Sequence, residues 1–102
     1  MTAEEIKKKD NIGNTVFIGD KNPMNYVTAV VMQFATKNAN EVVVKARGKF
    51  ISKAVDVVER AKNSFLEDDV DNNHVIIGSE GFKNKDGKDV KVSFIEITMK
   101  KK

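Results

Sequence analysis

The chain has 102 residues, 40% of them apolar, a size and composition that predict a single globular domain with an ordinary core. It lacks cysteine, which excludes disulfides and thiolate metal sites, and no apolar run approaches the ~20 residues of a membrane-spanning helix. The net charge is only +3, but seven lysines against three carboxylates follow Phe82, so the basic charge is concentrated near the end.

The first half of the chain predicts two strands around one helix. Residues 1–11 are polar and charged, without the apolar stretch of a secretory signal, and we expect a flexible lead-in there and a single domain over 12–102. A short apolar run, Thr15–Ile18, predicts a buried strand. Asn22 and a following proline predict the start of a helix over residues 23–37, and the β-branched run in Glu41–Ala46 predicts the next strand.

The second half predicts a helix followed by a hairpin. Apolar residues recur at helical spacing from Ile51 to Phe65, and residues 74–82 predict a strand after an acidic loop. Asp86-Gly87 predicts a two-residue hairpin turn. In the last strand the apolar alternation changes phase between Phe94 and Ile95, which predicts a β-bulge there. The order βαβαββ predicts a two-layer α/β sandwich, a four-stranded mixed sheet with two helices on one face and a protruding hairpin.

The sequence contains no recognisable set of catalytic residues. The one histidine, His74, has no evident partner that would make it a base, and no serine has a plausible triad. The acidic stretch of Glu67, Asp68, Asp69 and Asp71 lacks the alternating ligands of a calcium loop and is typical of a solvated loop. We therefore expect no catalytic residue, no metal and no cofactor.

Cationic residues gather at the two predicted strand-to-helix turns. Lys45, Arg47, Lys49 and Lys53 surround the second turn, and Lys21 lies at the first. Helix starts carry free N–H groups and a favourable dipole for phosphate, and parallel strands bring such turns to one edge of a sheet. Charge alone leaves a solvated rim without a partner as an equal alternative.

The predicted hairpin is the second cationic element. Lys83, Lys85, Lys88 and Lys91 lie on it. Basic β-ribbons can enter a groove of duplex DNA, but lysines also protect edge strands from aggregation. The pattern by itself does not decide between these roles.

Several segments together resemble the Alba family of archaeal chromatin proteins over about residues 16–102. The segments are Val16-Phe17-Ile18-Gly19, Lys21, Pro23-Met24-Asn25-Tyr26-Val27, Val44-Lys45-Ala46-Arg47-Gly48-Lys49, Ile51-Ser52-Lys53-Ala54-Val55-Asp56, Asn63-Ser64-Phe65-Leu66 and Val92-Ser93-Phe94-Ile95-Glu96-Ile97. The resemblance implies a homodimer that lies on double-stranded DNA, largely independently of sequence, with two hairpin arms reaching into minor grooves. It also implies coating or compaction of the chromosome in the cytoplasm, RNA binding by many members, and acetylation of a lysine in the first strand-to-helix turn.

The resemblance also implies which residues contact nucleic acid. These are Lys21, Asn25, Tyr26, Arg47, Lys49 and Lys53 on the body and Lys83, Lys85, Gly87 and Lys88 on the hairpin, with Phe65 where one dimer meets the next. The chain departs from the family at Asp20, where a basic residue is usual. Asp20 puts a negative charge beside the phosphate path and leaves Lys21 as the candidate for acetylation, with acetylating and deacetylating enzymes as partners.

Two other functions fit the same surface. An RNA-binding protein acting on structured RNA would use the same cations, because both duplex forms carry backbone charge. An interaction module whose basic surface meets an acidic protein is the alternative from another class.

Overall fold

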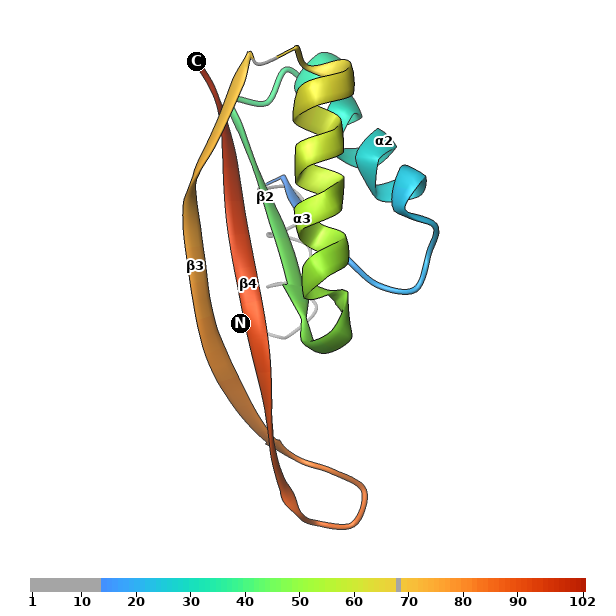
Figure 1. Ribbon diagram of the computed structural model, residues 1–102, viewed down its shortest axis with the longest axis vertical. Helices are drawn as coiled ribbons and strands as arrows, with labels where there is room; N and C mark the ends of the chain where they lie inside the picture. Colours follow the sequence, from blue (N-terminus) through green and yellow to red (C-terminus); the bar gives the residue numbers. More distant parts are fainter. Residues whose placement is uncertain (1–13, 68) are drawn as a thin grey trace.

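The computed structural model describes residues 14–67 and 69–102, so the predicted lead-in at 1–11 and Asp68 lie outside the described residues. Four strands form one sheet in the order β1-β2-β4-β3, in which β1 and β2 are parallel and the other neighbours antiparallel. Both helices cover one face of this sheet (Figure 1), which confirms the predicted βαβαββ sandwich. The elements are β1 (Thr15–Phe17), α2 (Pro23–Ala35), β2 (Glu41–Arg47), η1 (Gly48–Phe50), α3 (Ile51–Arg60), η2 (Ala61–Phe65), β3 (Val70–Lys83) and β4 (Asp89–Lys101).

The core lies between the sheet and the helices. In β2 the alternate residues Val42, Val44 and Ala46 are buried, and their neighbours point to the other face. Strand β4 contributes Ile95, Ile97 and Met99 to the same core. The period of two expected of a strand covered on one face explains both patterns. The helices supply the facing layer with Val27, Val30, Phe34, Ala54, Val57, Val58 and Ala61.

Helix α2 begins as predicted. The side-chain oxygen of Asn22 accepts a hydrogen bond from the backbone N–H of Met24 at 2.9 Å, and Pro23 occupies the first turn, where its missing N–H costs nothing. The helix ends at Ala35, two residues before the predicted end.

The second predicted helix has three parts. A 3₁₀ turn, η1, leads into α3, and the chain then continues to Phe65 as the π-helical η2. The predicted span of 51–65 is thus helical throughout, but its last five residues leave α geometry. Periodicity does not distinguish these helix types, because all of them return to one face after three to five residues.

The predicted bulge between Phe94 and Ile95 is wrong. Strand β4 runs without interruption, and Phe94 and Ile95 pair with Gly78 and Ile77 in consecutive register. The register shift lies instead on β3, between Asp71 and His74. The apolar phase changes along β4 because its apolar residues change face: Ile95, Ile97 and Met99 face the helices, whereas Val90, Val92 and Phe94 face the other side.

Two further predictions at β3 need correction. The strand begins at Val70, four residues before the predicted start, so Asp71 belongs to the strand and not to an acidic loop. The hairpin connection spans residues 84–88 and not two residues. Gly87 has φ +76°, and its N–H bonds the carbonyl of Asn84 at 3.0 Å, the arrangement of a type I turn closed by a left-handed glycine.

The hairpin extends beyond the body as a two-stranded arm. The last pair between β2 and β4 is Arg47 with Phe94, so in residues 79–93 the strand pairing is between β3 and β4 alone. Figure 1 shows this arm projecting past the start of α3. We call residues 79–93 the arm.

Candidate nucleic-acid interface

The turns after β1 and β2 lie side by side. Because β1 and β2 are parallel neighbours, both chains leave the sheet at the same edge. A direct link joins them: the Lys53 ammonium, from the first turn of α3, donates to the carbonyl of Gly19 at 2.7 Å and to the carbonyl of Lys21 at 3.0 Å. The two helix starts therefore form one surface, as the sequence predicts.

Tyr26 binds the N–H groups of the same β1–α2 loop. Its hydroxyl oxygen accepts hydrogen bonds from the backbone N–H of Gly19 at 2.9 Å and of Lys21 at 3.1 Å. The Lys53 ammonium lies 5.8 Å from the Tyr26 ring centroid and 5.4 Å from that of Phe50. Four hydrogen bonds from two side chains thus fix the backbone at Gly19 and Lys21, and we call this arrangement the loop clamp.

The clamp directs the remaining groups of the loop outward. Asp20, Lys21 and Asn25 are all exposed, and Asn25 lies in the first turn of α2. Tyr26 and Lys53 are only half-buried. The predicted contact residues of this turn are therefore brought together, with Lys21 and Asn25 facing solvent and Tyr26 and Lys53 supporting the loop.

Arg47 and Lys49 extend the cationic surface to the second turn. Arg47, at the end of β2, is exposed and forms an ion pair with Glu80 of the arm at 3.4 Å. The Lys49 ammonium lies 5.3 Å from the Phe50 ring centroid, at the start of α3. Exposed ion pairs contribute little stability, so the Arg47 guanidinium remains available to an anion.

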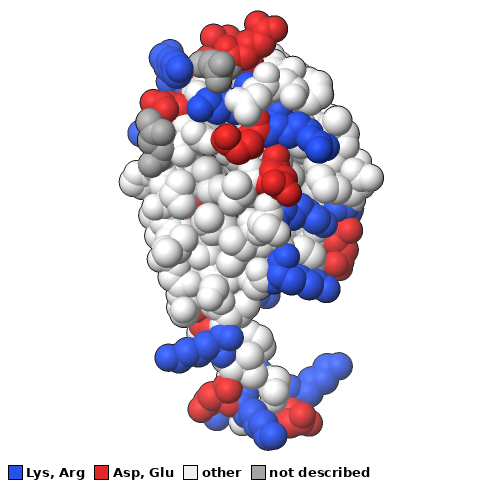
Figure 2. All heavy atoms as spheres, viewed as in Figure 1, with Lys and Arg blue, Asp and Glu red and all other residues white. Residues whose placement is uncertain are grey.

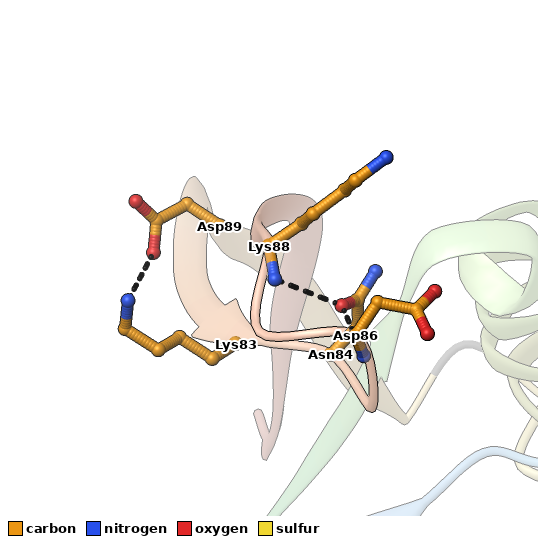
Figure 3. Close-up of polar contacts among 5 residues, drawn as sticks. All are labelled: Lys83, Asn84, Asp86, Lys88 and Asp89. Carbon is orange, nitrogen blue, oxygen red and sulfur yellow. Dashed lines mark hydrogen bonds and ion pairs between the residues drawn. The ribbon is translucent and has the colours of Figure 1, made fainter.

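The arm carries its lysines at a tip ordered by Asn84. The side-chain oxygen of Asn84 accepts hydrogen bonds from the N–H of Asp86 at 2.9 Å and of Lys88 at 3.0 Å (Figure 3). Lys83 pairs with Asp89 at 3.5 Å across the arm, whereas the Lys88 side chain points away from the tip. The arm therefore presents Lys85 and Lys88 on a compact turn without a side chain at Gly87.

The charged side chains leave one broad part of the surface free in the view of Figure 2. Lysines and arginines lie near the start of α3, on the arm and at the opposite end of the body, and carboxylates lie among them in all three places. Phe65 lies in η2, at the other end of the helix from the clamp, with 49% of its surface exposed. The predicted site residues thus form a body cluster, an arm cluster and the separate Phe65.

A broad uncharged surface lies beside β3. Figure 2 shows it between the charged end of the body and the lysines of the arm. Strand β3 is an edge of the sheet, and its Val75 and Ile77, paired with Ile97 and Ile95, are 50% and 76% exposed. Val55 of α3 adds a further exposed apolar side chain. A long apolar edge strand of this kind is normally covered by a partner.

Over residues 14–67 and 69–102 no cluster of three or more potential ligand side chains could hold a metal ion. No helix in that part of the chain is long and apolar enough to cross a membrane.

A family model described as Alba matches residues 14–79, well over half of the chain. The chain belongs to the Alba family. This match confirms the resemblance inferred from the sequence, and the family description and the names of the relatives given below specify no enzymatic activity.

Relatives and solved structures of the Alba family cover most of the chain. A protein of Methanococcus maripaludis named "DNA/RNA-binding protein Alba" is 47% identical over 84% of this chain and 96% of its own length. One of Nanoarchaeum equitans with the same name is 52% identical over 85% and 97%. The structure of Alba from Thermoplasma volcanium superposes with a TM-score of 0.79 at 44% identity, covering 86% of this chain and all of that one. ALBA1 from Trypanosoma brucei gives 0.67 at 25% identity, covering 86% and 68%.

Sequence reasoning missed three residues of this Alba surface. Gly19 supplies a carbonyl to the clamp, Glu80 pairs with Arg47, and Asn84 orders the arm tip. Of the three, only Asn84 could have been predicted from the sequence. The side chain of an asparagine just before an Asp-Gly turn often accepts hydrogen bonds from the N–H groups that follow it.

Proposed function

We propose that this protein binds double-stranded DNA largely independently of sequence and coats or compacts the chromosome as a dimer. The observation that carries the proposal is the pair of helix starts joined by the loop clamp. It puts Lys21, Arg47 and Lys49 on one edge of the molecule. Membership of a family whose relatives are named for DNA and RNA binding supports it.

The mechanism is neutralisation of backbone phosphates. Each cation that meets a phosphate releases condensed counterions, which favours binding without reading bases. The N-terminal N–H groups of α2 and α3 add partial positive charge at the same edge. Lys53 was also predicted to contact phosphate. Its ammonium already has two carbonyl acceptors, so its main contribution is to hold the loop that displays Lys21.

The arm reaches a groove next to the surface bound by the body. A two-stranded ribbon fits a groove of duplex DNA, and Lys85 and Lys88 at its tip lie beside phosphates on either side. Gly87, with no atom within 4 Å of the place where a Cβ would be, lets the tip approach the backbone closely. Residues 79–93 hold four lysines and three carboxylates, so the arm has little net charge and contributes to binding through its shape as much as through its charge.

A second copy of the chain covers the uncharged surface. Val55, Val75 and Ile77 would meet the same residues of a partner, since most homodimers pair identical patches about a two-fold axis. The pairing removes an apolar edge strand from solvent and gives the DNA two arms. Phe65 then joins neighbouring dimers along the duplex, and Lys21 is the site where acetylating and deacetylating enzymes tune the charge.

Structured RNA is the second candidate. The names of the relatives, which specify both DNA and RNA, favour it, and the clamped cationic edge would meet either backbone.

The test is a binding series with duplex DNA and duplex RNA of one sequence, measured across salt. Binding to several unrelated DNA sequences with equal affinity, and a steep decrease with salt, is the expected result. Affinity that does not change with salt would refute phosphate neutralisation. A strong preference for RNA in the same series would assign the protein to the second candidate.

A further inference from the structure

The face of the sheet opposite the helices carries a hollow, and of the residues that line it only Arg47 belongs to the proposed duplex-binding surface. It measures about 580 Å³, within the range of roughly 300–1,000 Å³ typical of small-ligand sites. Its side chains come from all four strands: Phe17, Lys45, Arg47, Glu80, Phe94 and Glu96. We call it the sheet pocket.

The register places all of these residues except Glu80 in two rows across the sheet. Phe17 pairs with Lys45, and Lys45 with Glu96. In the next row on this face, Arg47 pairs with Phe94, and Phe94 with Gly78. Residues paired across a sheet share a face, so each row holds one aromatic ring beside one cation.

The two rings flank the pocket in different ways. Phe17 lies on the edge strand β1 with half its surface exposed, and the Lys45 ammonium is 5.8 Å from its ring centroid. The ring of Phe94 lies over Gly78, where an added Cβ would come within 2.7 Å of Cζ, so only glycine leaves room for this ring on the sheet. The pocket therefore has an aromatic group on each side.

Hydrogen-bonding groups of both kinds, acceptors and donors, line the pocket together with the two rings. Glu96 pairs with Lys45 at 3.7 Å and Glu80 with Arg47 at 3.4 Å, and each of these side chains keeps about a third or more of its surface exposed. Carboxylates accept from exocyclic amino and ring N–H groups of bases, and the cations donate to base carbonyls or phosphate. Aromatic stacking together with both kinds of group is the chemistry that recognises a nucleobase.

We propose that the sheet pocket binds unpaired bases of single-stranded nucleic acid, which stack on Phe17 and Phe94. Bases in a duplex cannot enter, because they are stacked and paired inside the helix. The pocket is continuous with the phosphate path: Arg47 lines it and directly precedes η1 with Lys49. A strand that leaves a duplex bound on the body would reach the pocket along this path, and only this part of the proposal rests on the proposed function.

A tryptophan at position 17 provides the direct test. The chain has no tryptophan, so Phe17→Trp places one fluorophore in the pocket and keeps an aromatic ring there. Single-stranded oligouridylate and oligothymidylate should quench its emission, because stacked bases quench indole. An abasic oligonucleotide of equal length and a blunt duplex should not. Quenching by the RNA strand alone, or by the DNA strand alone, would support the pocket and identify which single strand is bound.

A matched pair of variants separates stacking from simple apolar contact. Phe17→Leu keeps an apolar side chain but removes the ring, and should weaken single-strand binding by roughly 5- to 150-fold, the range for removal of one base stack. Phe17→Tyr keeps the ring and should bind as the unmodified chain does. Duplex affinity, measured in parallel, should be equal in all three proteins. If the protein did not bind duplex but single strands still quenched the tryptophan emission, only the proposed function would be refuted.

Ultraviolet crosslinking of the unmodified protein makes the test independent of how variants fold. Adducts of oligouridylate should map to the peptides that contain Phe17 or Phe94. Adducts confined to other peptides would overturn the proposal. So would equal affinity for abasic and base-bearing strands, or equal single-strand affinity of Phe17→Leu and the unmodified protein.

Discussion

The Lys53 ammonium lies 2.7 Å from the carbonyl oxygen of Gly19, which ties the first turn of α3 to the loop before α2. Tyr26 bonds the N–H groups of that loop, so its backbone has partners for both donors and acceptors. Lys53 thus stabilises the loop, whereas Lys21 is proposed to contact DNA, and substitutions can separate these two roles.

Removal of the Tyr26 hydroxyl should loosen the loop without changing any charge. In Tyr26→Phe the N–H groups of Gly19 and Lys21 lose their acceptor. Because the first of these bonds is only partly buried and the second is exposed, we expect the free energy of unfolding to fall by about 1 kcal/mol. Duplex affinity should also fall, since Lys21 is no longer held in place. Urea denaturation and a binding titration measure the two effects. Lys21→Met is the control, and it should weaken binding with no change in stability; unchanged affinity in Tyr26→Phe would mean that the clamp does not position Lys21.

Removal of the outer cations should change the salt dependence. Arg47→Ala with Lys49→Ala eliminates two proposed phosphate contacts per chain, and the slope of log affinity against log salt should fall by about 0.9 for each phosphate that is no longer neutralised. All DNA sequences should be affected alike. Lys37→Ala, an exposed lysine beyond the other end of α2, is the matched control and should leave the slope unchanged. A slope equal to that of the unmodified protein would place the binding surface elsewhere.

Shortening the arm tip should weaken duplex binding and leave the fold intact. Replacing residues 84–88 by Asn-Gly joins Lys83 to Asp89 through a tight turn, a change that hairpin tips tolerate. Circular dichroism should be unchanged while affinity drops. Lys85→Gln with Lys88→Gln keeps the tip but removes its charge, and comparison of the two variants separates shape from charge. Equal affinity for the shortened and full arms would show that the arm serves only to protect the sheet.

Reversal of the charge at Asp20 should tighten duplex binding. Asp20 is exposed in the clamped loop, two residues before the cap of α2, so its interaction with the helix dipole is at the low end of about 0.3–1 kcal/mol. Asp20→Lys removes a repulsion and adds a phosphate contact, which steepens the salt slope by about 0.9 per phosphate. We expect several-fold higher affinity at low salt, an increase that shrinks as salt rises, and an intermediate result for Asp20→Asn. No increase at any salt would mean that this loop does not face DNA.

A lysine on the exposed edge strand should separate the proposed dimer. Ile77 is 76% exposed in the single chain, and Ile77→Lys would bury an unpaired charge in the proposed interface. Sedimentation should show a mass of two chains for the unmodified protein and of one chain, 11.4 kDa, for the variant. Met32→Lys, at a 48% exposed position on α2, is the control. Dimers that persist in Ile77→Lys would place the interface on another surface.

The sequence alone determined the order of elements and the position of the cationic turns. Asn22 with Pro23 marks the start of α2, and the β-branched run of β2 marks a strand beside β1, because these signals act within a few neighbouring residues. Parallel pairing then brings Lys21 and Arg47 to one edge by topology. The family segments around these residues added the expectation of DNA binding.

Only the tertiary structure decided what each side chain faces. The change of apolar phase at Phe94 looks the same in the sequence whether the strand contains a bulge or its apolar residues move to the other face of the sheet. The continuous register of β4 shows that the apolar residues change face. Lys49 and Lys53 are both lysines near one helix start, yet Lys49 lies beside the Phe50 ring and Lys53 binds two carbonyls of a loop distant in sequence. Periodicity fixes the face of an element on which a residue lies, whereas the partner on that face depends on contacts between segments that only folding brings together.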